Sequence, residues 1–486
     1  MKTLLRLALA GLLLFAAVLM VNTARLPAPA SRAPAASPPA VDAEAAAARL
    51  AGAIRLPTIS HEDPAARDPR PFDALAAYLE AQFPRVHAQL QRERINGQSL
   101  LYRWEGRDPA AAPWLLLAHL DVVPVEPGTE STWTQPPFSG AIADGHIWGR
   151  GTLDDKASAM AWLEAAEALL AQGHVPPQTV YFAFGHDEEV GGQEGAQAIA
   201  ALLQARGVQA ALVLDEGGAI TQGLVAGVDR PVASIMAGEK GYASFRLRVR
   251  AEGGHSSMPP LRTAAGRVAA AVARVQEQPM PARITAPVRE MLRRLAPELP
   301  LAQRVAIAND RLFAPLLLRA FAGAAVTRAL TRTSFAPTML RAGIKDNVLP
   351  AEAEAVINVR LLPGDAMADV EAHLRRVIDD PEVELERLAH FSGEASALSP
   401  TDTPEFRRLE TAVNAVFPEA LVSTGLVVGG TDARHYGAVA RLRYNFTPVL
   451  LRADDLPRIH GRDERIAVDA YANMVRWYAA VLRPAP

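Results

Sequence analysis

Short apolar runs alternate with long helical patterns in the first half of this chain, and this alternation restricts the fold more than any other feature. The runs are Trp114–Ala118, Thr179–Phe184 and Ala211–Leu214, and the helical patterns include Lys156–Gln172 and Gly195–Arg206. Buried strands that alternate with helices form a mostly parallel sheet with helices on both faces. We therefore predict an α/β fold in which helices sandwich such a sheet.

The pattern changes near residue 240. Apolar residues and arginines alternate from Phe245 to Arg250, and a second alternating stretch runs from Ile357 to Leu361. A period of two is typical of a strand with one face in solvent. We predict an inserted α+β domain over residues 240–389, and a catalytic domain built from residues 42–239 and 390–486.

The amino terminus has the pattern of an export segment. Lys2 and Arg6 precede an uncharged apolar run from Leu7 to Val21, and a stretch rich in proline and alanine follows. Residues 1–24 are a signal peptide or a membrane anchor, and the sequence leaves both open. Residues 25–41 are predicted to be a linker. We expect an exported protein, periplasmic or extracellular, which is either anchored by this segment or secreted after cleavage.

Composition limits the chemistry. The chain has no cysteine, so disulfides, thiolate metal ligands and cysteine nucleophiles are excluded. The formal net charge of −3 over 486 residues has no basic excess of the kind that binds nucleic acid. Any metal site must therefore be built from histidine, aspartate and glutamate.

Acidic residues and a histidine follow the apolar runs. The candidates at these positions are His119, Asp121, Glu188, Glu189 and Asp215, and Asp154 lies between the segment Gly149-Arg150-Gly151 and a predicted helix. Each alone could be a helix cap or a structural histidine. Ligands of open α/β sheets bind beyond the carboxyl ends of the strands, so these side chains should converge and would repel one another without a cation. Oxygen and imidazole ligands favour zinc, manganese or cobalt, and two ions sharing a carboxylate would use this many groups.

The residues around these positions resemble the di-zinc aminoacylase and carboxypeptidase family. The resemblance runs from about residue 45 to the end of the chain. The matching segments are His119-Leu-Asp121, Gly149-Arg-Gly-Thr-Leu-Asp154-Asp155-Lys156, Asp187-Glu188-Glu189-Val-Gly-Gly, Leu214-Asp215-Glu216-Gly, Gly254-His255-Ser-Ser and His460-Gly-Arg-Asp-Glu464.

The resemblance implies which of two metal ions each candidate ligand would bind. Asp154 is similar to the carboxylate that bridges two divalent ions, most simply zinc. His119 and Asp215 would complete one ion, and Glu189 and His460 the other. The family fold adds a lid and dimerisation domain, which corresponds to residues 240–389 and is called the lid domain below.

The resemblance also implies catalytic and binding residues. Glu188 is similar to the general base that activates the metal-bridging water, and Asp121 to the acid that orients the ligand imidazole. His255 is similar to a histidine that stabilises the oxyanion across a homodimer interface formed by the lid domain. Asn347 and Arg360 match substrate-contacting positions, and Gly430 lies in a glycine-rich segment that approaches the substrate.

The function implied is hydrolysis of an amide bond next to a free carboxylate, in a small peptide or an N-acyl amino acid. The export segment and the apolar stretch Val288–Leu330 favour the carboxypeptidase S branch. That stretch is interpreted as extra packing, as the lining of an acyl pocket, or as a surface that lies on a membrane. A di-zinc aminopeptidase and a catalytically silent binding protein of the same fold are the alternatives.

Overall fold

The computed structural model describes residues 1–27, 40–388 and 392–483. Most of the predicted linker over residues 25–41, and the predicted domain boundary at residue 389, lie outside the described residues. The boundary at residue 240 falls between strands β9 (Val232–Glu239) and β10 (Gly241–Arg250). The domain limits stay predictions.

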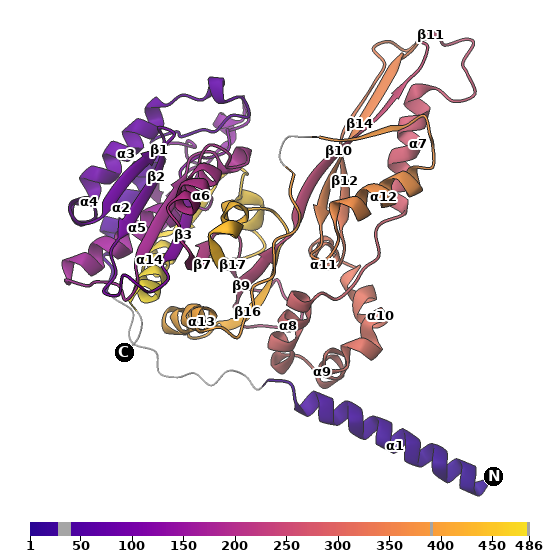
Figure 1. Cartoon of the computed structure of the whole chain (residues 1–486), viewed down its shortest axis with the longest axis horizontal. Helices are drawn as coiled ribbons and strands as arrows, with labels where there is room; N and C mark the ends of the chain where they lie inside the picture. Colours follow the sequence, from indigo (N-terminus) through magenta and orange to yellow (C-terminus); the bar gives the residue numbers. More distant parts are fainter. Residues whose placement is uncertain (28–39, 389–391, 484–486) are drawn as a thin grey trace.

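The centre of the molecule is a 10-stranded mixed sheet (Figure 1). Its order is β1-β2-β6-β3-β7-β17-β9-β8-β18, with β16 pairing to β9. The four central strands β6, β3, β7 and β17 are parallel to one another, and antiparallel pairs flank them. The bounds not yet given are β1 (Gln91–Ile95), β2 (Ser99–Trp104), β3 (Trp114–His119), β6 (Val180–Gly185), β7 (Ala210–Asp215), β8 (Ile220–Thr221), β16 (Leu421–Val427), β17 (Ala440–Asn445) and β18 (Leu450–Leu451).

Helices cover both faces of this sheet, because alternate side chains of each strand enter different cores. Leu116 of β3 packs into the core beneath one set of helices, whereas Leu115 and Leu117 pack on the opposite face. Helix α6 (Ala196–Ala205) covers that opposite face. The first set is α2 (Ala43–Ile54), α5 (Lys156–Ala171), α13 (Pro404–Val416) and α14 (Val468–Leu482). The predicted fold class is confirmed.

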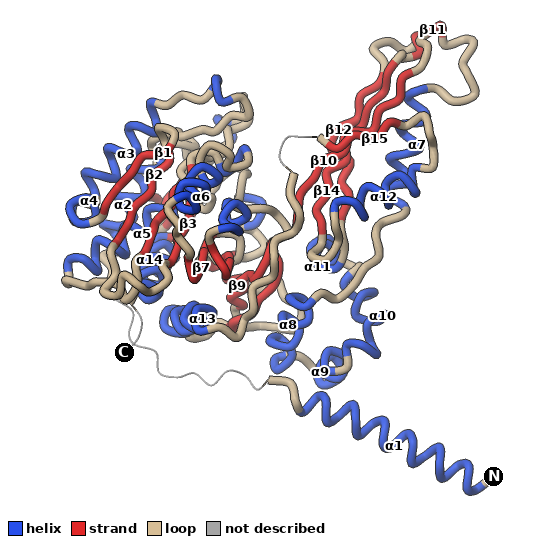
Figure 2. The backbone as a smooth tube through the Cα atoms, viewed as in Figure 1, coloured by secondary structure: helices blue, strands red, loops and turns tan. Residues whose placement is uncertain are grey.

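Smaller elements complete the catalytic domain. Helices α3 (Arg70–Gln82) and α4 (Pro84–Gln89) lie at its outer edge (Figure 2). A small sheet of β4 (Ala141–Ala143), β5 (His146–Trp148) and β19 (Arg465–Ala467) joins the middle of the chain to its carboxyl-terminal part.

The lid domain contains a four-stranded antiparallel sheet in the order β12-β14-β10-β15. Phe245 of β10 faces Ile357 of β14, and both are fully buried beneath helices α7 and α12. The opposite face carries arginine–glutamate pairs such as Arg248 with Glu384. A short pair, β11 with β13, forms the tip far from the central sheet (Figure 1). The bounds are β11 (Gly254–His255), α7 (Ala264–Glu277), β12 (Ser334–Ala342), β13 (Val348–Leu349), β14 (Glu352–Leu361), α12 (Met367–Ile378) and β15 (Glu384–Arg387).

Four helices fill the apolar stretch between α7 and β12. They are α8 (Ala286–Leu295), α9 (Leu301–Ala308), α10 (Asp310–Phe321) and α11 (Ala325–Thr331). Helix α8 packs on the catalytic domain, where Leu295 joins a core with Val232 and Leu421. Helix α8 therefore adds apolar packing to the catalytic domain, which is one of the three interpretations given for this stretch. Helix α10 differs, since Asp310 is the one residue of α10 that is buried.

The amino-terminal helix α1 (Lys2–Ala24) extends away from the rest of the molecule (Figure 1). It has 23 residues with a mean hydropathy of 2.5 in its most apolar window, and that window is not buried by the protein. At 1.5 Å per residue it is about 34 Å long, against roughly 30 Å for the hydrocarbon core of a bilayer. By length and composition it can cross a membrane, a test that signal sequences also pass.

Candidate metal centre

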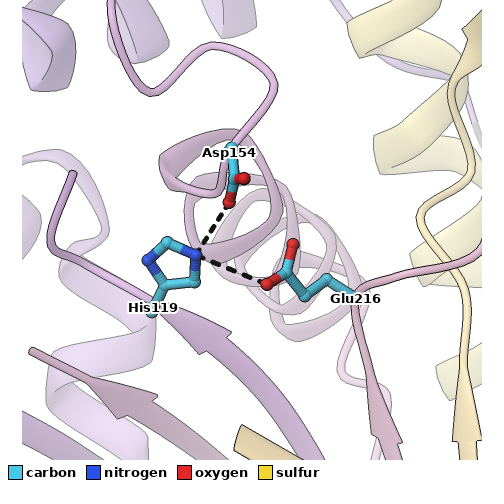
Figure 3. A group of neighbouring side chains, drawn as sticks. All are labelled: His119, Asp154 and Glu216. Carbon is cyan, nitrogen blue, oxygen red and sulfur yellow. Dashed lines mark hydrogen bonds and ion pairs between the residues drawn. The ribbon is translucent and has the colours of Figure 1, made fainter. Parts of the chain in front are cut away.

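Three side chains from different strand ends meet above the central sheet. His119 ends β3, Asp154 lies in the loop before α5, and Glu216 follows β7. The Nε2 atom of His119 is 2.9 Å from Oδ1 of Asp154 and 3.5 Å from Oε1 of Glu216 (Figure 3). Their ligand atoms lie close enough together to hold one metal ion.

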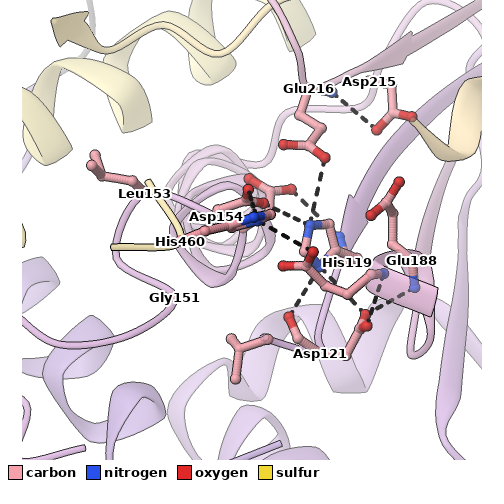
Figure 4. Close-up of polar contacts among 12 residues, drawn as sticks. His119, Asp121, Gly151, Leu153, Asp154, Glu188, Asp215, Glu216 and His460 are labelled. Carbon is pink, nitrogen blue, oxygen red and sulfur yellow. Dashed lines mark hydrogen bonds and ion pairs between the residues drawn. The ribbon is translucent and has the colours of Figure 1, made fainter. Parts of the chain in front are cut away.

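A second group shares Asp154 with the first. Nε2 of His460 is 3.0 Å from Oδ2 of Asp154 and 3.2 Å from Oε2 of Glu189 (Figure 4). The two oxygens of Asp154 therefore face different histidines. Among the described residues, the buried Oε1 of Glu189 has no hydrogen-bond partner. Oxygen and imidazole atoms without thiolate suit a hard or borderline divalent ion, so the residues fit a metal centre.

Asp215 does not join either group. Its carboxylate accepts hydrogen bonds from the backbone N–H of Ala433, at 2.7 Å, and of Glu216, at 3.0 Å. Asp215 is the last residue of β7, so its side chain and that of the next residue point in different directions. The residue that faces His119 is Glu216, which belongs to the same motif but is not among the predicted ligands.

Asp121 connects His119 to the loop after β6. Its Oδ1 lies 3.3 Å from Nδ1 of His119, and its carboxylate accepts the backbone N–H groups of Glu188 and Glu189, each at 3.1 Å. Asp121 is fully buried. Nδ1 of His119 also donates to the backbone carbonyl oxygen of Asp121 at 3.0 Å, so this one residue contacts both the imidazole and the backbone of the two glutamates.

Glu188 stands beside the two groups without belonging to either. Burial raises the pKa of the Glu188 carboxyl well above its usual range, and the charge of Asp432 adds to the effect. Burial, and then the charge of Asp154, raises the pKa of Glu216 to about 8. Carboxylates gathered at such a site ionise together when a cation lies among them.

A buried ion pair between Arg150 and Glu464 supports the Asp154 loop. Glu464 accepts a hydrogen bond from Nη1 of Arg150 at 2.6 Å and from the backbone N–H groups of Gly151 and Leu153 at 2.9 and 2.8 Å. Arg150 also donates to the carbonyl oxygen of His460 at 3.0 Å. Both residues lie within the matched motifs, but the sequence alone predicts no role for them, because only the fold brings the two motifs together.

A cleft of about 750 Å³ opens beside the two ligand groups. Glu188, Glu189 and His460 line one part of it, and Arg360 and Gly430 line another. The guanidinium of Arg360 lies 4.5 Å above the ring of Tyr242, which also borders the cleft.

Two of the predicted site residues do not reach this cleft. His255 and Asn347 lie at the lid tip, where the backbone N–H of Ser256 donates to the carbonyl oxygen of Asn347 at 3.2 Å. Conversely, Arg434 lines the cleft and was not among the candidates. Its Nη1 is 3.8 Å from Oε1 of Glu188.

The chain is similar to known proteins along most of its length. Residues 115–483 match the model of peptidase family M20/M25/M40. The chain is 38% identical to the N-fatty-acyl-amino acid synthase/hydrolase PM20D1 of Xenopus tropicalis, over 89% of this chain and 84% of that protein. It is 37% identical to probable carboxypeptidase S-like 2 of Dictyostelium discoideum, over 99% of this chain and 93% of that protein.

Solved structures show the same fold. The M20 family metallo-carboxypeptidase of Sulfolobus solfataricus superimposes with a TM-score of 0.67 at 20% identity, covering 90% of this chain and 98% of that one. Both the family match and the identity over nearly the whole chain show common descent. The chain therefore belongs to the M20 peptidase family, in the branch of carboxypeptidase S-like proteins, and is a metal-dependent hydrolase of amide bonds.

Proposed function

We propose that this protein hydrolyses the amide bond next to a free carboxylate, in small peptides or N-acyl amino acids, with Glu188 as the general base. The observation that carries the proposal is that two neighbouring glutamates in the loop after β6 occupy different positions. Glu189 belongs to a ligand group, whereas its neighbour Glu188 stands outside both groups and lines the cleft. A base must be close to the metal centre and free of it.

The proposed centre holds two divalent ions. His119, Asp154 and Glu216 would bind one, and Asp154, Glu189 and His460 the other, with Asp154 as the bridge. Zinc is the first choice, and manganese or cobalt suits the same donor set. Bound ions supply Lewis acidity, which lowers the pKa of water and polarises the substrate carbonyl.

Glu188 then moves the proton. It takes a proton from the attacking water and delivers it to the leaving nitrogen, so that the amine departs neutral. Its raised pKa supports this role, because burial makes the carboxylate a stronger base than an exposed glutamate. Asp121 keeps the backbone of residue 188 in place through the hydrogen bond from its N–H.

Cleft residues supply the proposed substrate recognition. Arg360 would bind the substrate carboxylate through its planar guanidinium, and Gly430 leaves the backbone open to the substrate. Arg434 borders the same cleft and adds a second guanidinium near Glu188. The relatives with an N-fatty-acyl-amino acid name support an acyl amino acid substrate.

The lid tip supports a homodimer as the working form. His255 and Asn347 lie together at the tip and away from the cleft of their own chain. We place both residues in the cleft of a second subunit, where His255 would donate a hydrogen bond to the developing oxyanion. We further propose that the protein is exported and that α1 tethers it to the membrane.

Replacement of Glu188 tests the proposal. Glu188→Gln keeps the size of the side chain but removes the base, so turnover should fall by roughly 10² to 10⁴-fold. Metal content per chain, measured by elemental analysis, should stay at the wild-type level. Glu62→Gln is the matched control, since Glu62 lines the same cleft and has no proposed role in proton transfer. Near-normal turnover in Glu188→Gln would overturn the assignment.

A further inference from the structure

We propose that the outward face of α10, together with Leu301 of α9 and Val326 of α11, binds the surface of a bilayer that contains anionic phospholipid. The inference rests on the membrane tether proposed above and extends it. It assigns a second membrane contact to the body of the enzyme.

Large apolar side chains stand exposed on one side of α10. Leu312 and Leu316 are 53% and 59% exposed, and residues four apart lie on the same face of a helix. Leu301 on α9 and Val326 on α11, the helices before and after α10, are 56% and 66% exposed. Other residues of α10, Leu317 and Phe321, pack against the core beneath it, so the helix is held in place with Leu312 and Leu316 outward.

Arginines flank these leucines. Arg311, Arg319 and Arg328 are exposed, and within the described residues none of them has a carboxylate partner within 4.0 Å.

The acidic residues of the same segment are already paired with other arginines. Asp310 pairs with Arg289 at 2.5 Å, and Glu298 pairs with Arg230 at 2.9 Å. Glu290 pairs with Arg294 at 2.8 Å. The segment therefore presents leucine and unneutralised arginine together, the combination that binds anionic headgroups while apolar side chains enter the acyl boundary.

Contacts with α1 identify the occupant as a bilayer. Nδ2 of Asn22, near the end of α1, donates to Oδ1 of Asn309 at 2.8 Å, and Nδ2 of Asn309 donates to the carbonyl oxygen of Leu19 at 3.3 Å. Asn309 is the residue that precedes α10. Leu26 packs into the core formed by α8 and α9. The residue before α10 is thus hydrogen-bonded to the last turns of α1, beside α9 (Figure 1). In a membrane-spanning α1, these turns lie where the helix leaves the hydrocarbon.

The surface is also rigidly joined to the active enzyme. Helix α8, which shares a core with α9 and α10, packs on the catalytic domain through Leu295 and Leu421. Binding of α10 to the bilayer would therefore fix the orientation of the catalytic domain. A single tether would leave that orientation free.

The absence of cysteine makes a direct test available. Leu316→Cys in the full chain is labelled with an environment-sensitive fluorophore, and the protein is reconstituted into vesicles of phosphatidylcholine and phosphatidylglycerol. Nitroxide-bearing lipids with the quencher near the headgroup should quench this label strongly. Ile142→Cys is the matched control, because Ile142 is 50% exposed but lies on β4 of the catalytic domain. Equal quenching at the two positions would overturn the inference.

Two further variants separate the possible outcomes. A label at Leu12→Cys in α1 reports the tether alone, so quenching there without quenching at Leu316→Cys refutes the α10 surface while the tether stands. In a membrane-spanning α1, Leu12 lies near the middle of the bilayer, so its label is tested with nitroxides placed deep in the acyl chains, and no quenching by these lipids refutes the tether. Arg311→Glu combined with Arg319→Glu should reduce quenching at Leu316→Cys, since each arginine contributes roughly a 5-fold preference for an anionic surface. Quenching that persists unchanged in this variant contradicts the electrostatic part of the inference.

Discussion

Two buried residues outside the candidate ligand groups support the backbone that carries those groups. Glu464 is fully buried and holds the backbone of residues 151 and 153, which leads directly into Asp154. Its partner Arg150 also binds the carbonyl oxygen of His460. The segments that carry Asp154 and His460 thus contact the same ion pair, although neither member of the pair is among the residues that line the cleft.

Glu464→Gln should weaken metal binding. The amide would present a donor to the Nη1 donor of Arg150, so the loop that carries Asp154 loses part of its support. We expect metal affinity to fall on the order of 10 to 100-fold, measured by competition with a chromophoric chelator. Glu405→Gln, at a partly exposed position in α13, is the control. Unchanged affinity in Glu464→Gln would show that the ion pair does not position the ligands.

The sequence predicted most members of the two candidate ligand groups, but not all of them. His119, Asp154, Glu189 and His460 could be named because each follows a recognisable strand or motif. Asp215 and Glu216 are neighbours, and the last residue of β7 decides which one faces His119. A shift of one residue at a strand end reverses the direction of a side chain, so a pattern of residue types cannot make this distinction.

At the level of secondary structure, one buried carboxyl joins the ends of three elements. Glu239 ends β9, and its Oε1 accepts hydrogen bonds from Thr431, which precedes the 3₁₀ helix over residues 432–438, and from Asn445 at the end of β17. Burial raises the pKa of Glu239 to about 7, and the charge of Asp215 contributes in the same direction.

The stability of the fold should depend on pH through Glu239. Its pKa is about 7 when folded and about 4.5 when unfolded, so its contribution is complete below pH 4.5 and is lost as the pH rises to 7. The difference corresponds to about 3 kcal/mol. Glu239→Gln keeps the acceptor oxygen without the charge and should lack this loss, as measured by urea unfolding across the range. Glu105→Gln, which is exposed, should follow the wild type. Parallel curves for wild type and Glu239→Gln would contradict the prediction.

Over the whole molecule, the lid domain separates two parts of the predicted site. The fold class followed from the alternation of strands and helices, and the change of pattern near residue 240 marked a second sheet. The sequence could not show that His255 lies at a tip away from its own cleft, because that distance depends on how the two domains are joined. The contact of Asn22 with Asn309, 287 residues away, was equally beyond a reading of local patterns.

Mixing two inactive variants tests whether the site is completed by a partner. His255→Ala and Glu188→Gln should each be inactive alone. In a mixed dimer, one cleft has an intact Glu188 and receives an intact His255 from the other subunit. An equal mixture should recover about a quarter of wild-type turnover, since half of the dimers are mixed and each has one complete site. Failure to recover activity, with mixed dimers confirmed by differential tags, would place the function of His255 within its own chain or remove it.

The ion pair between Arg150 and Glu464 also has a consequence for biosynthesis. These two residues are 314 positions apart, and His460 lies within the same late segment. A nascent chain that has delivered His119, Asp154 and Glu189 still lacks the residue that fixes the loop and one of the proposed ligands. With these ligands, hydrolytic competence arises only when the final part of the chain has emerged from the ribosome.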